Sequence, residues 1–275
     1  MRGFRDQHGR AVITQIVSLL TRIAEAETSV AVWDLACAQY RNWGFARANY
    51  GFTRFKSARS IGDPDDALFL TTSDAGYVQR YFRNNFYART PVFRWAERNS
   101  GSCTWTWVRS AFDAGTLPPD EAETVVQNAA IGVIAGISVS FPTASMRAKG
   151  ALGLMADPGL DHAAVDRIYA DIRPELEAVA HMMHLKLIQL PFPARRRALT
   201  SRQREALEWV ADGKTSQDVA VLMGVSAAMV EKHLRLAREA LDVGTTAQAV
   251  AKAAMMNQIF HKTVADAPTA IAGRS

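Results

Sequence analysis

The segment from Thr215 to Leu241, TSQDVAVLMGVSAAMVEKHLRLAREAL, constrains the fold of this chain more than any other. Ala220 is small enough for two helices to cross closely, and Gly224 can adopt the positive φ of a sharp turn without steric cost. Ser226 stands where its hydroxyl can accept a free backbone N–H at the start of a second helix. The segment therefore predicts two short helices joined by a tight turn.

The second of these helices has two different faces. Apolar residues recur at the spacing of a buried helical stripe, namely Val230, Leu234, Ala237 and Leu241. The opposite face is small and mostly basic, and it consists of Ala227, Ala228, Glu231, Lys232, Arg235 and Arg238. An apolar back and a basic front are typical of a recognition helix that lies in the major groove of DNA.

The flanking sequence extends this pattern over a whole domain. We expect Thr200 or Ser201 to cap a preceding helix and a fourth helix to span about residues 246–259. With LTSRQREALEWVADGKT, MVEKHL and TTAQAVAKA, residues 196–260 resemble the four-helix DNA-binding domain of the LuxR-type regulators. The DNA-binding residues that we expect are Lys214, Thr215, Ser226, Ala228, Glu231, Lys232, Arg235 and Arg238. Glu231 can accept a hydrogen bond from a cytosine amino group, remain solvated, or repel phosphate.

The charge of the chain is concentrated in the same region. The whole sequence carries 32 basic and 27 acidic side chains, a formal net charge of +5. Residues 195–263 hold 11 Lys and Arg against 7 Asp and Glu, a net charge of +4. This excess is the footprint expected of a phosphate-binding surface and favours double-stranded DNA as a partner.

The N-terminal half predicts a different architecture. Its expected order is two helices, two strands, helices, three strands and one long helix capped by Asp161. One of the strands is expected over residues 103–108, where Trp alternates with Thr. Adjacent strand pairs favour an antiparallel sheet within an α/β/α sandwich. The fold class is therefore α+β, with an all-α C-terminal domain.

The proline-containing stretch QLPFPARRRA separates these two parts. We expect four regions, which are a sensor domain over 1–188, a linker over 189–198, a DNA-binding domain over 199–260 and a tail over 261–275. The N-terminus lacks the apolar core of a secretory signal, and the most apolar run, residues 129–141, is too short to cross a bilayer. We therefore expect a cytoplasmic protein without membrane attachment.

The first 190 residues resemble the acyl-homoserine-lactone-binding domain of the same LuxR-type family. Its pattern is an aromatic residue, a Tyr four later, an Asp-Pro nine after that, and a Trp fifteen beyond the Asp. Here those places hold Tyr77, Tyr81, Thr90-Pro91 and Trp105. The resemblance implies that Tyr81 and Trp105 donate to the ligand's acyl and lactone carbonyls, and that Tyr77 replaces a Trp facing the ring.

Two positions depart from the family pattern. Thr90 stands in place of the Asp that accepts the ligand amide N–H, and a hydroxyl forms a weaker bond than a carboxylate. Ala156 lies at or next to a place where the family offers a Ser or Thr. The ligand-binding residues that we expect are therefore Tyr77, Tyr81, Thr90, Trp105 and Ala156. The same aromatic residues, with Trp95 and Trp107, can instead form part of a packed core.

The sequence offers little support for an enzyme. His181 and His184 lie three residues apart, but no third ligand with metal-site spacing follows. Gly-rich phosphate loops and a nucleophile elbow are lacking, and we expect no cofactor beyond a small-molecule signal. A response regulator is disfavoured because its receiver needs alternating strands and helices.

We therefore expect a ligand-responsive, DNA-binding transcriptional regulator of the quorum-sensing LuxR type, which forms a homodimer. Its signal is expected to be an acyl-homoserine lactone. RNA polymerase is an additional partner if the protein is an activator. The alternative is an orphan regulator that senses another small molecule or acts without ligand.

Overall fold

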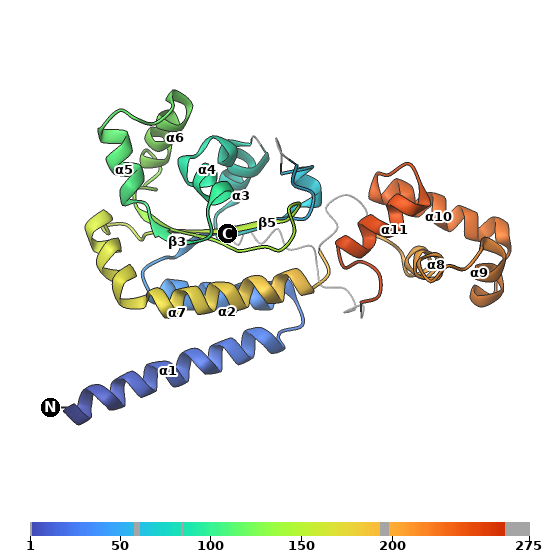
Figure 1. Ribbon diagram of the computed structural model, residues 1–275, viewed down its shortest axis with the longest axis horizontal. Helices are drawn as coiled ribbons and strands as arrows, with labels where there is room; N and C mark the ends of the chain where they lie inside the picture. The colour runs from blue at the N-terminus through green and yellow to red at the C-terminus, as the bar shows by residue number, and fades with distance from the viewer. Residues whose placement is uncertain (1, 58–60, 84, 193–197, 262–275) are drawn as a thin grey trace. The chain divides into compact units, whose positions relative to one another are not determined.

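The computed structural model describes residues 2–57, 61–83, 85–192 and 198–261 (Figure 1). These residues form two compact units, one ending at Leu187 and the other beginning at Ile188. We call them the N-terminal unit and the C-terminal unit, and each is described by itself.

The N-terminal unit is an α/β/α sandwich, as predicted. Its sheet has the order β2-β1-β5-β4-β3, and every neighbouring pair is antiparallel. The strands are β1 (Arg47–Thr53), β2 (Leu68–Thr71), β3 (Gly101–Thr104), β4 (Gly136–Ser140) and β5 (Lys149–Met155). The helices are α1 (Arg2–Glu25), α2 (Ser29–Asn42), α3 (Ala75–Val78), α4 (Pro91–Arg98), α5 (Thr106–Asp113), α6 (Pro119–Ala129) and α7 (His162–Gln189).

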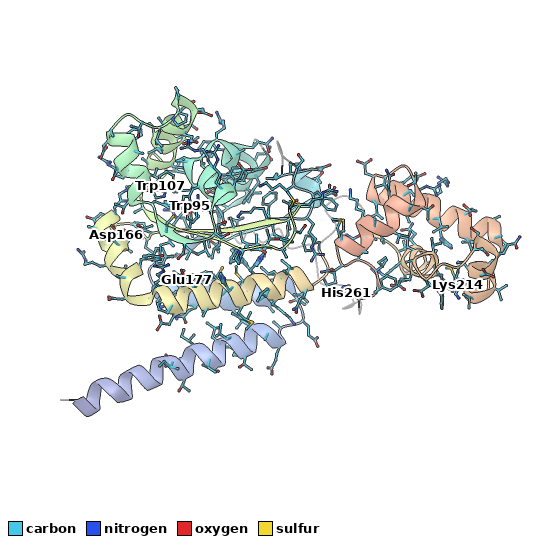
Figure 2. The ribbon with its side chains drawn as sticks, in the orientation of Figure 1. Trp95, Trp107, Asp166, Glu177, Lys214 and His261 are labelled. Atoms are coloured by element: carbon cyan, nitrogen blue, oxygen red, sulfur yellow. The ribbon has the colours of Figure 1, made fainter. Side chains whose placement is uncertain are left out.

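The two faces of the sheet are covered differently. The helices α2 and α7 lie on one face, and α3 to α6 lie on the other (Figure 1). Figure 2 shows the tryptophans Trp95 and Trp107 on the side of α3 to α6, and Glu177 on α7 across the sheet. The face toward α2 and α7 carries large buried side chains, among them Tyr50, Leu152 and Leu154.

The strand predicted over residues 103–108 is wrong in its second half. The Trp105 N–H donates the last ladder bond to the Gly136 carbonyl at 2.9 Å, and the backbone then turns with φ −85° and ψ 10°. The carbonyl of Trp105 accepts from Val108 and Arg109, which begins α5. Alternating Trp and Thr residues suit a strand locally. The pairing of β3 with β4 nevertheless ends at Thr104, and the chain leaves the sheet there.

The C-terminal unit contains the four helices that the sequence predicts. They are α8 (Ser201–Ala211), α9 (Ser216–Met223), α10 (Ala227–Leu241) and α11 (Thr246–Met255). Each begins at a side-chain cap, in order Thr200, Thr215, Ser226 and Thr245. Their apolar faces enclose one small core that includes Leu207, Val230 and Leu234.

Part of the expected linker packs on the C-terminal unit. Phe192 is buried, and its N–H donates to the Met256 carbonyl at 3.0 Å. The side-chain amide of Asn257 donates to the carbonyls of Ile188 and Leu190. Residues 193–197 of the expected linker, and the expected tail from residue 262 onward, lie outside the described residues.

Candidate functional site

Four of the five predicted ligand residues line a single cavity in the N-terminal unit. Tyr77, Tyr81, Thr90 and Trp105 border a space of about 70 Å³ between the sheet and α3, α4 and α6. They come from three separate stretches of chain, and the fold brings them together around one cavity. We call this space the head cavity.

Ala156 does not line the head cavity. It is buried, and its N–H donates to the Ala135 carbonyl at 3.0 Å. The preceding residue, Met155, borders the cavity instead. Neighbouring strand residues face opposite sides of a sheet, so a shift of one position moves the side chain to the other face.

A row of polar side chains, interrupted by one glycine, crosses the sheet beneath the head cavity. Thr71, Asn49, Gly153, Ser138 and Cys103 are successive cross-strand partners on β2, β1, β5, β4 and β3. Three of them hold the predicted site. The Asn49 amide donates to the Tyr77 hydroxyl at 2.7 Å, the Thr71 hydroxyl donates to Asn49 Oδ1 at 2.7 Å, and Trp105 Nε1 donates to Ser138 Oγ at 2.9 Å.

Asn49 and Ser138 were missed by sequence reasoning, and so was Asn128, which lines the head cavity from α6. Asn49 and Ser138 stand in apolar strand segments, where a buried polar residue needs a partner. That local signal marks both residues as unusual. It does not identify their partners, because these lie 28 and 33 residues away.

Tyr81 is the central aromatic residue of the site. Its ring stacks on Tyr77 with the centroids 5.0 Å apart and the planes at 15°. Burial raises the pKa of the Tyr81 hydroxyl, and the side chains of Thr90 and Asn49 lower it to a lesser extent. The hydroxyl is therefore protonated at neutral pH and available as a donor.

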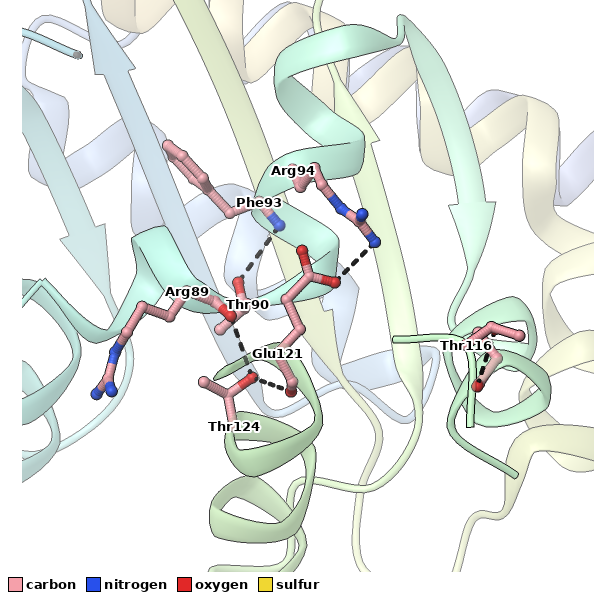
Figure 3. A network of polar contacts seen from close by, with 8 residues as sticks. Arg89, Thr90, Phe93, Arg94, Thr116, Glu121 and Thr124 are labelled. Carbon is pink, nitrogen blue, oxygen red and sulfur yellow. Dashed lines mark hydrogen bonds and ion pairs between the residues drawn. The ribbon is translucent and has the colours of Figure 1, made fainter. Parts of the chain in front are cut away.

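Thr90 already has a structural role. Its hydroxyl donates to the Tyr87 carbonyl at 2.8 Å and accepts from the Phe93 N–H at 3.3 Å, which makes it the N-cap of α4 (Figure 3). Next to it, Arg94 pairs with Glu121 at 2.7 Å and ties α4 to α6. Thr90 thus has less capacity to accept a further hydrogen bond than a free carboxylate would have.

A second, larger cavity adjoins the head cavity. It measures about 110 Å³, and both cavities are bordered by Asn49, Tyr81, Val92 and Gly153. Its wall is largely aromatic, with Phe52, Phe69, Phe82, Tyr87 and Phe93. We call it the tail cavity. Small residues on the sheet, Gly51 and Gly153, leave the space open.

The C-terminal unit presents the predicted helix-turn-helix. Gly224 ends α9 with φ +65°, a left-handed conformation that favours glycine. The Ser226 hydroxyl then accepts from the Met229 N–H at 3.3 Å and caps α10. Val230, Leu234, Ala237 and Leu241 are buried, so the opposite face of α10 is turned to solvent.

Most predicted DNA-binding residues lie on that exposed surface. All seven of these residues are exposed, namely Lys214 and Thr215 before α9 and Ser226, Ala228, Glu231, Lys232 and Arg235 at the start of α10 and along it. Thr215 and Ser226 also cap helices through their hydroxyls. Glu231 accepts a hydrogen bond from Ser216 Oγ at 2.5 Å, and Arg235 pairs with Glu239 at 2.5 Å. The acidic residue on the recognition helix is therefore held against the start of α9.

Arg238 differs from the other predicted residues. It is half-buried, and its Nη1 donates to Thr246 Oγ1 at 2.8 Å, which connects α10 to the start of α11. A guanidinium held in this way acts as an internal link between two helices. Lys232 and Arg235 are the Lys and Arg residues of α10 that are exposed.

His184 belongs to the core of the N-terminal unit. Its Nδ1 lies 2.8 Å from the Tyr50 hydroxyl, and its ring stacks on Phe141 with centroids 4.1 Å apart. Burial, and to a lesser extent the charge of His181, lower the pKa of His184 to about 4. Within the described residues, no group of three or more His, Cys, Asp or Glu side chains is placed to hold a metal ion.

Comparison with protein families matches both units. A model of the autoinducer binding domain matches residues 28–187, and a model of sigma-70 region 4 matches residues 197–241. None of the described helices is long and apolar enough to cross a membrane.

Two curated relatives match most of the chain. The HTH-type quorum sensing-dependent transcriptional regulator RpaR of Rhodopseudomonas palustris is 29% identical over 226 residues, which cover 77% of this chain and 84% of RpaR. The transcriptional activator protein SolR of Ralstonia solanacearum is 28% identical over 219 residues, covering 78% and 85%.

Among solved structures, Escherichia coli SdiA has the same fold. It matches with a TM-score of 0.51 and 18% identity, and the match covers 91% of this chain and 100% of SdiA.

Proposed function

Because this chain belongs to the LuxR-type quorum-sensing transcriptional regulators with an autoinducer-binding domain, we propose that its signal is an N-acyl-homoserine lactone. The domain limits that we propose are 1–188 for the sensor, 189–198 for the linker and 199–260 for DNA binding, followed by a tail over 261–275. The protein acts in the cytoplasm as a homodimer, and RNA polymerase is a further partner if it activates transcription.

The observation that carries this proposal is that the two cavities lie next to each other and share Asn49, Tyr81, Val92 and Gly153 as lining residues. The head cavity has hydrogen-bonding groups on its wall, whereas the tail cavity is largely aromatic. An acyl-homoserine lactone has the same division, with a polar ring and amide at one end and an apolar chain at the other. Ligand sites are mostly apolar, with a few placed polar groups.

The polar contacts of the lactone are proposed residue by residue. Tyr81 donates to the acyl carbonyl, and Tyr77 packs against the ring. Trp105 donates to the lactone carbonyl by exchanging the bond that its one N–H makes to Ser138 Oγ without ligand. Thr90 lines the amide end, but its hydroxyl also caps α4. The amide N–H therefore gains less from Thr90 than from a carboxylate, since charge-assisted bonds are about twice as strong as neutral ones.

Ligand binding is coupled to DNA binding through stability. A cavity inside the core lacks the contacts that a filled core makes, so a ligand that fills it stabilises the folded unit. The ordered protein then presents two recognition helices, one from each subunit, to two half-sites. Glu231, Lys232 and Arg235 on α10, with Lys214 before α9, form the proposed surface for DNA.

The experiment is a thermal-melting series of the full chain with acyl-homoserine lactones of different chain length. A ligand at about 100 times its Kd stabilises the protein by about 2.7 kcal/mol. We expect a clear rise in Tm with at least one lactone. The Tyr81→Phe variant, which removes one hydroxyl and keeps the ring, should show a smaller rise.

Thr90→Asp is the complementary variant. Asp also caps helices well, so α4 should keep its N-cap and the site gains a charged acceptor, at the loss of the bond that Thr90 donates to the Tyr87 carbonyl. We expect tighter lactone binding, by about tenfold. If no lactone shifts the Tm of wild-type protein that still binds DNA, the acyl-homoserine-lactone proposal is wrong and a different signal or ligand-independent action is indicated.

A further inference from the structure

The tail cavity changes character at the end away from the head cavity. Most of its wall is apolar, but in the described part of the chain three charged residues border it, namely Lys56, Lys149 and Glu97. They come from the segment after β1, the start of β5 and α4. A purely hydrocarbon chain cannot accept hydrogen bonds from two ammonium groups at its end. A role for these residues in ligand binding rests on the proposed function, because the ligand is taken to enter with its polar head near Trp105.

Lys149 has a structural contact that leaves donors free. It pairs with Thr53 across the β1–β5 ladder, and its Nζ donates to the Asn99 carbonyl at 2.9 Å. Lysine near the end of a helix often bonds to a carbonyl there, and Asn99 is the residue that follows α4. An ammonium has three N–H donors, so this bond leaves two of them for another acceptor.

Lys56 lies beside Lys149 and lacks such a contact. Its N–H donates to the Arg147 carbonyl at 2.8 Å, which places it next to the chain that enters β5. Its side chain is half-buried, and within the described residues no hydrogen bond or ion pair holds its ammonium. Burial lowers the pKa of Lys149, the charge of Lys56 lowers it further, and Glu97 acts in the opposite direction.

The charges at this end do not balance. Among the described residues that border this end, the two ammonium groups and one carboxylate of Lys56, Lys149 and Glu97 leave a net charge of +1 (two minus one). Like charges that are partly removed from water destabilise the protein unless an opposite charge lies between them. A carboxylate at the end of a bound chain can accept hydrogen bonds from both lysines.

We propose that Lys56 and Lys149 form an anion subsite, and that the tail cavity takes a ligand whose apolar chain ends in a carboxylate. The head cavity then holds the amide end of the molecule, Gly153 and Tyr81 border the chain, and the two lysines fix the far end. The ligand class is an ω-carboxylated acyl amide rather than a simple fatty-acyl amide.

The test uses four synthetic ligands that vary the two ends independently. N-octanoyl-homoserine lactone and its counterpart with a carboxylate on the eighth carbon share the lactone head. The corresponding two N-methyl amides lack it. Kd values for the full chain are measured by calorimetry. We expect wild-type protein to bind the carboxylated lactone about five- to tenfold more tightly than the octanoyl lactone.

Two variants assign that preference. Lys56→Met keeps the length and removes the charge, and it should abolish the preference, so that the two lactones bind with about equal Kd. Lys186→Met on α7, outside the tail cavity, should retain the preference. Equal or weaker binding of the carboxylated lactone by wild-type protein overturns the anion subsite, as does a preference that survives in the Lys56→Met, Lys149→Met double variant.

The four ligands also separate this inference from the proposed function. If the lactone head matters and the tail charge does not, the anion subsite is wrong and the lactone proposal stands. If the tail charge matters and the lactone head does not, the lactone proposal is wrong and the subsite stands. Failure of all four ligands to bind contradicts both.

Discussion

The two units of this protein differ in how completely their interiors are packed. In the C-terminal unit, four capped helices close around a small core of residues such as Leu207, Val230 and Leu234. In the N-terminal unit, the helices α3, α4 and α6 lie over a sheet whose small residues leave two adjacent cavities. A filled core maximises packing, whereas a hollow one leaves part of the stabilisation for a ligand to supply.

The difference also appears in how polar groups are satisfied. The C-terminal unit uses short-range bonds, such as the capping boxes at Thr200, Thr215 and Thr245. The N-terminal unit places Asn49 and Ser138 inside, and their partners come from distant parts of the chain. A unit held by hydrogen bonds between residues close in sequence can be predicted from the sequence. A ligand site held by bonds between distant residues cannot be predicted in this way.

The largest expected effect comes from Gly136→Ala in β4. A Cβ at Gly136 would overlap the Leu154 carbonyl oxygen and lie 2.9 Å from the Trp105 ring. Because β5 and Trp105 cannot both move aside, we expect the N-terminal unit to lose about 4 kcal/mol or more. Thermal unfolding should show this loss, and the C-terminal transition should not change.

Gly153→Ala is the matched control for that variant. Its Cβ would be 4.0 Å from the nearest side-chain atom, an ordinary contact, and it would extend into the junction of the two cavities. We expect unliganded stability within about 0.5 kcal/mol of wild type and a smaller ligand-induced rise in Tm. Equal damage from both glycine variants would contradict the open space assigned to Gly153 at the junction.

Leu234→Ala tests the filled core of the other unit. Leu234 is buried on α10 within the apolar cluster of the C-terminal unit. Its truncation should cost about 2–5 kcal/mol, because the packed core collapses only partly around the lost atoms. Differential scanning calorimetry should show one weakened transition, with lactone binding retained. If both transitions fall together, the two units do not unfold independently and the contrast between them fails.

Acid should weaken the N-terminal unit through His184. Its folded pKa is about 4 against 6.5 in the unfolded chain, so the unfolded state binds more protons between those values. Stability is complete above pH 6.5 and falls as the pH drops toward 4, by up to about 3 kcal/mol. Urea unfolding across this range measures the loss, and His184→Phe should flatten it. An unchanged slope in that variant would assign the acid sensitivity to other groups.

The smallest effects should separate Lys232 from Arg238 on α10. Lys232 is exposed, so Lys232→Ala should weaken DNA binding and lower the slope of log K against log salt by about 1. Arg238 donates to Thr246, so Arg238→Ala should cost about 1 kcal/mol of stability and leave the slope unchanged. Titrations at several salt concentrations decide between the two roles. A reduced slope for Arg238→Ala would return this residue to the DNA surface.

The sequence by itself determined the C-terminal unit almost completely. Gly224 has the positive φ that its position predicts, and Ser226 caps α10 as expected. These features depend on residues within four positions of one another, and hydrogen bonds of that range are encoded locally. The sequence also determined the class of the N-terminal fold, because strands in adjacent pairs favour antiparallel pairing.

The tertiary structure alone decided the composition of the ligand site. Resemblance to the family pattern predicted that Tyr77, Tyr81, Thr90 and Trp105 share a pocket, but Met155 borders the head cavity where Ala156 was expected. Asn49, Ser138, Lys56 and Lys149 enter the site because sheet order and register bring β1, β4 and β5 side by side. Register depends on contacts between residues far apart in the chain, and periodicity along one segment cannot specify them.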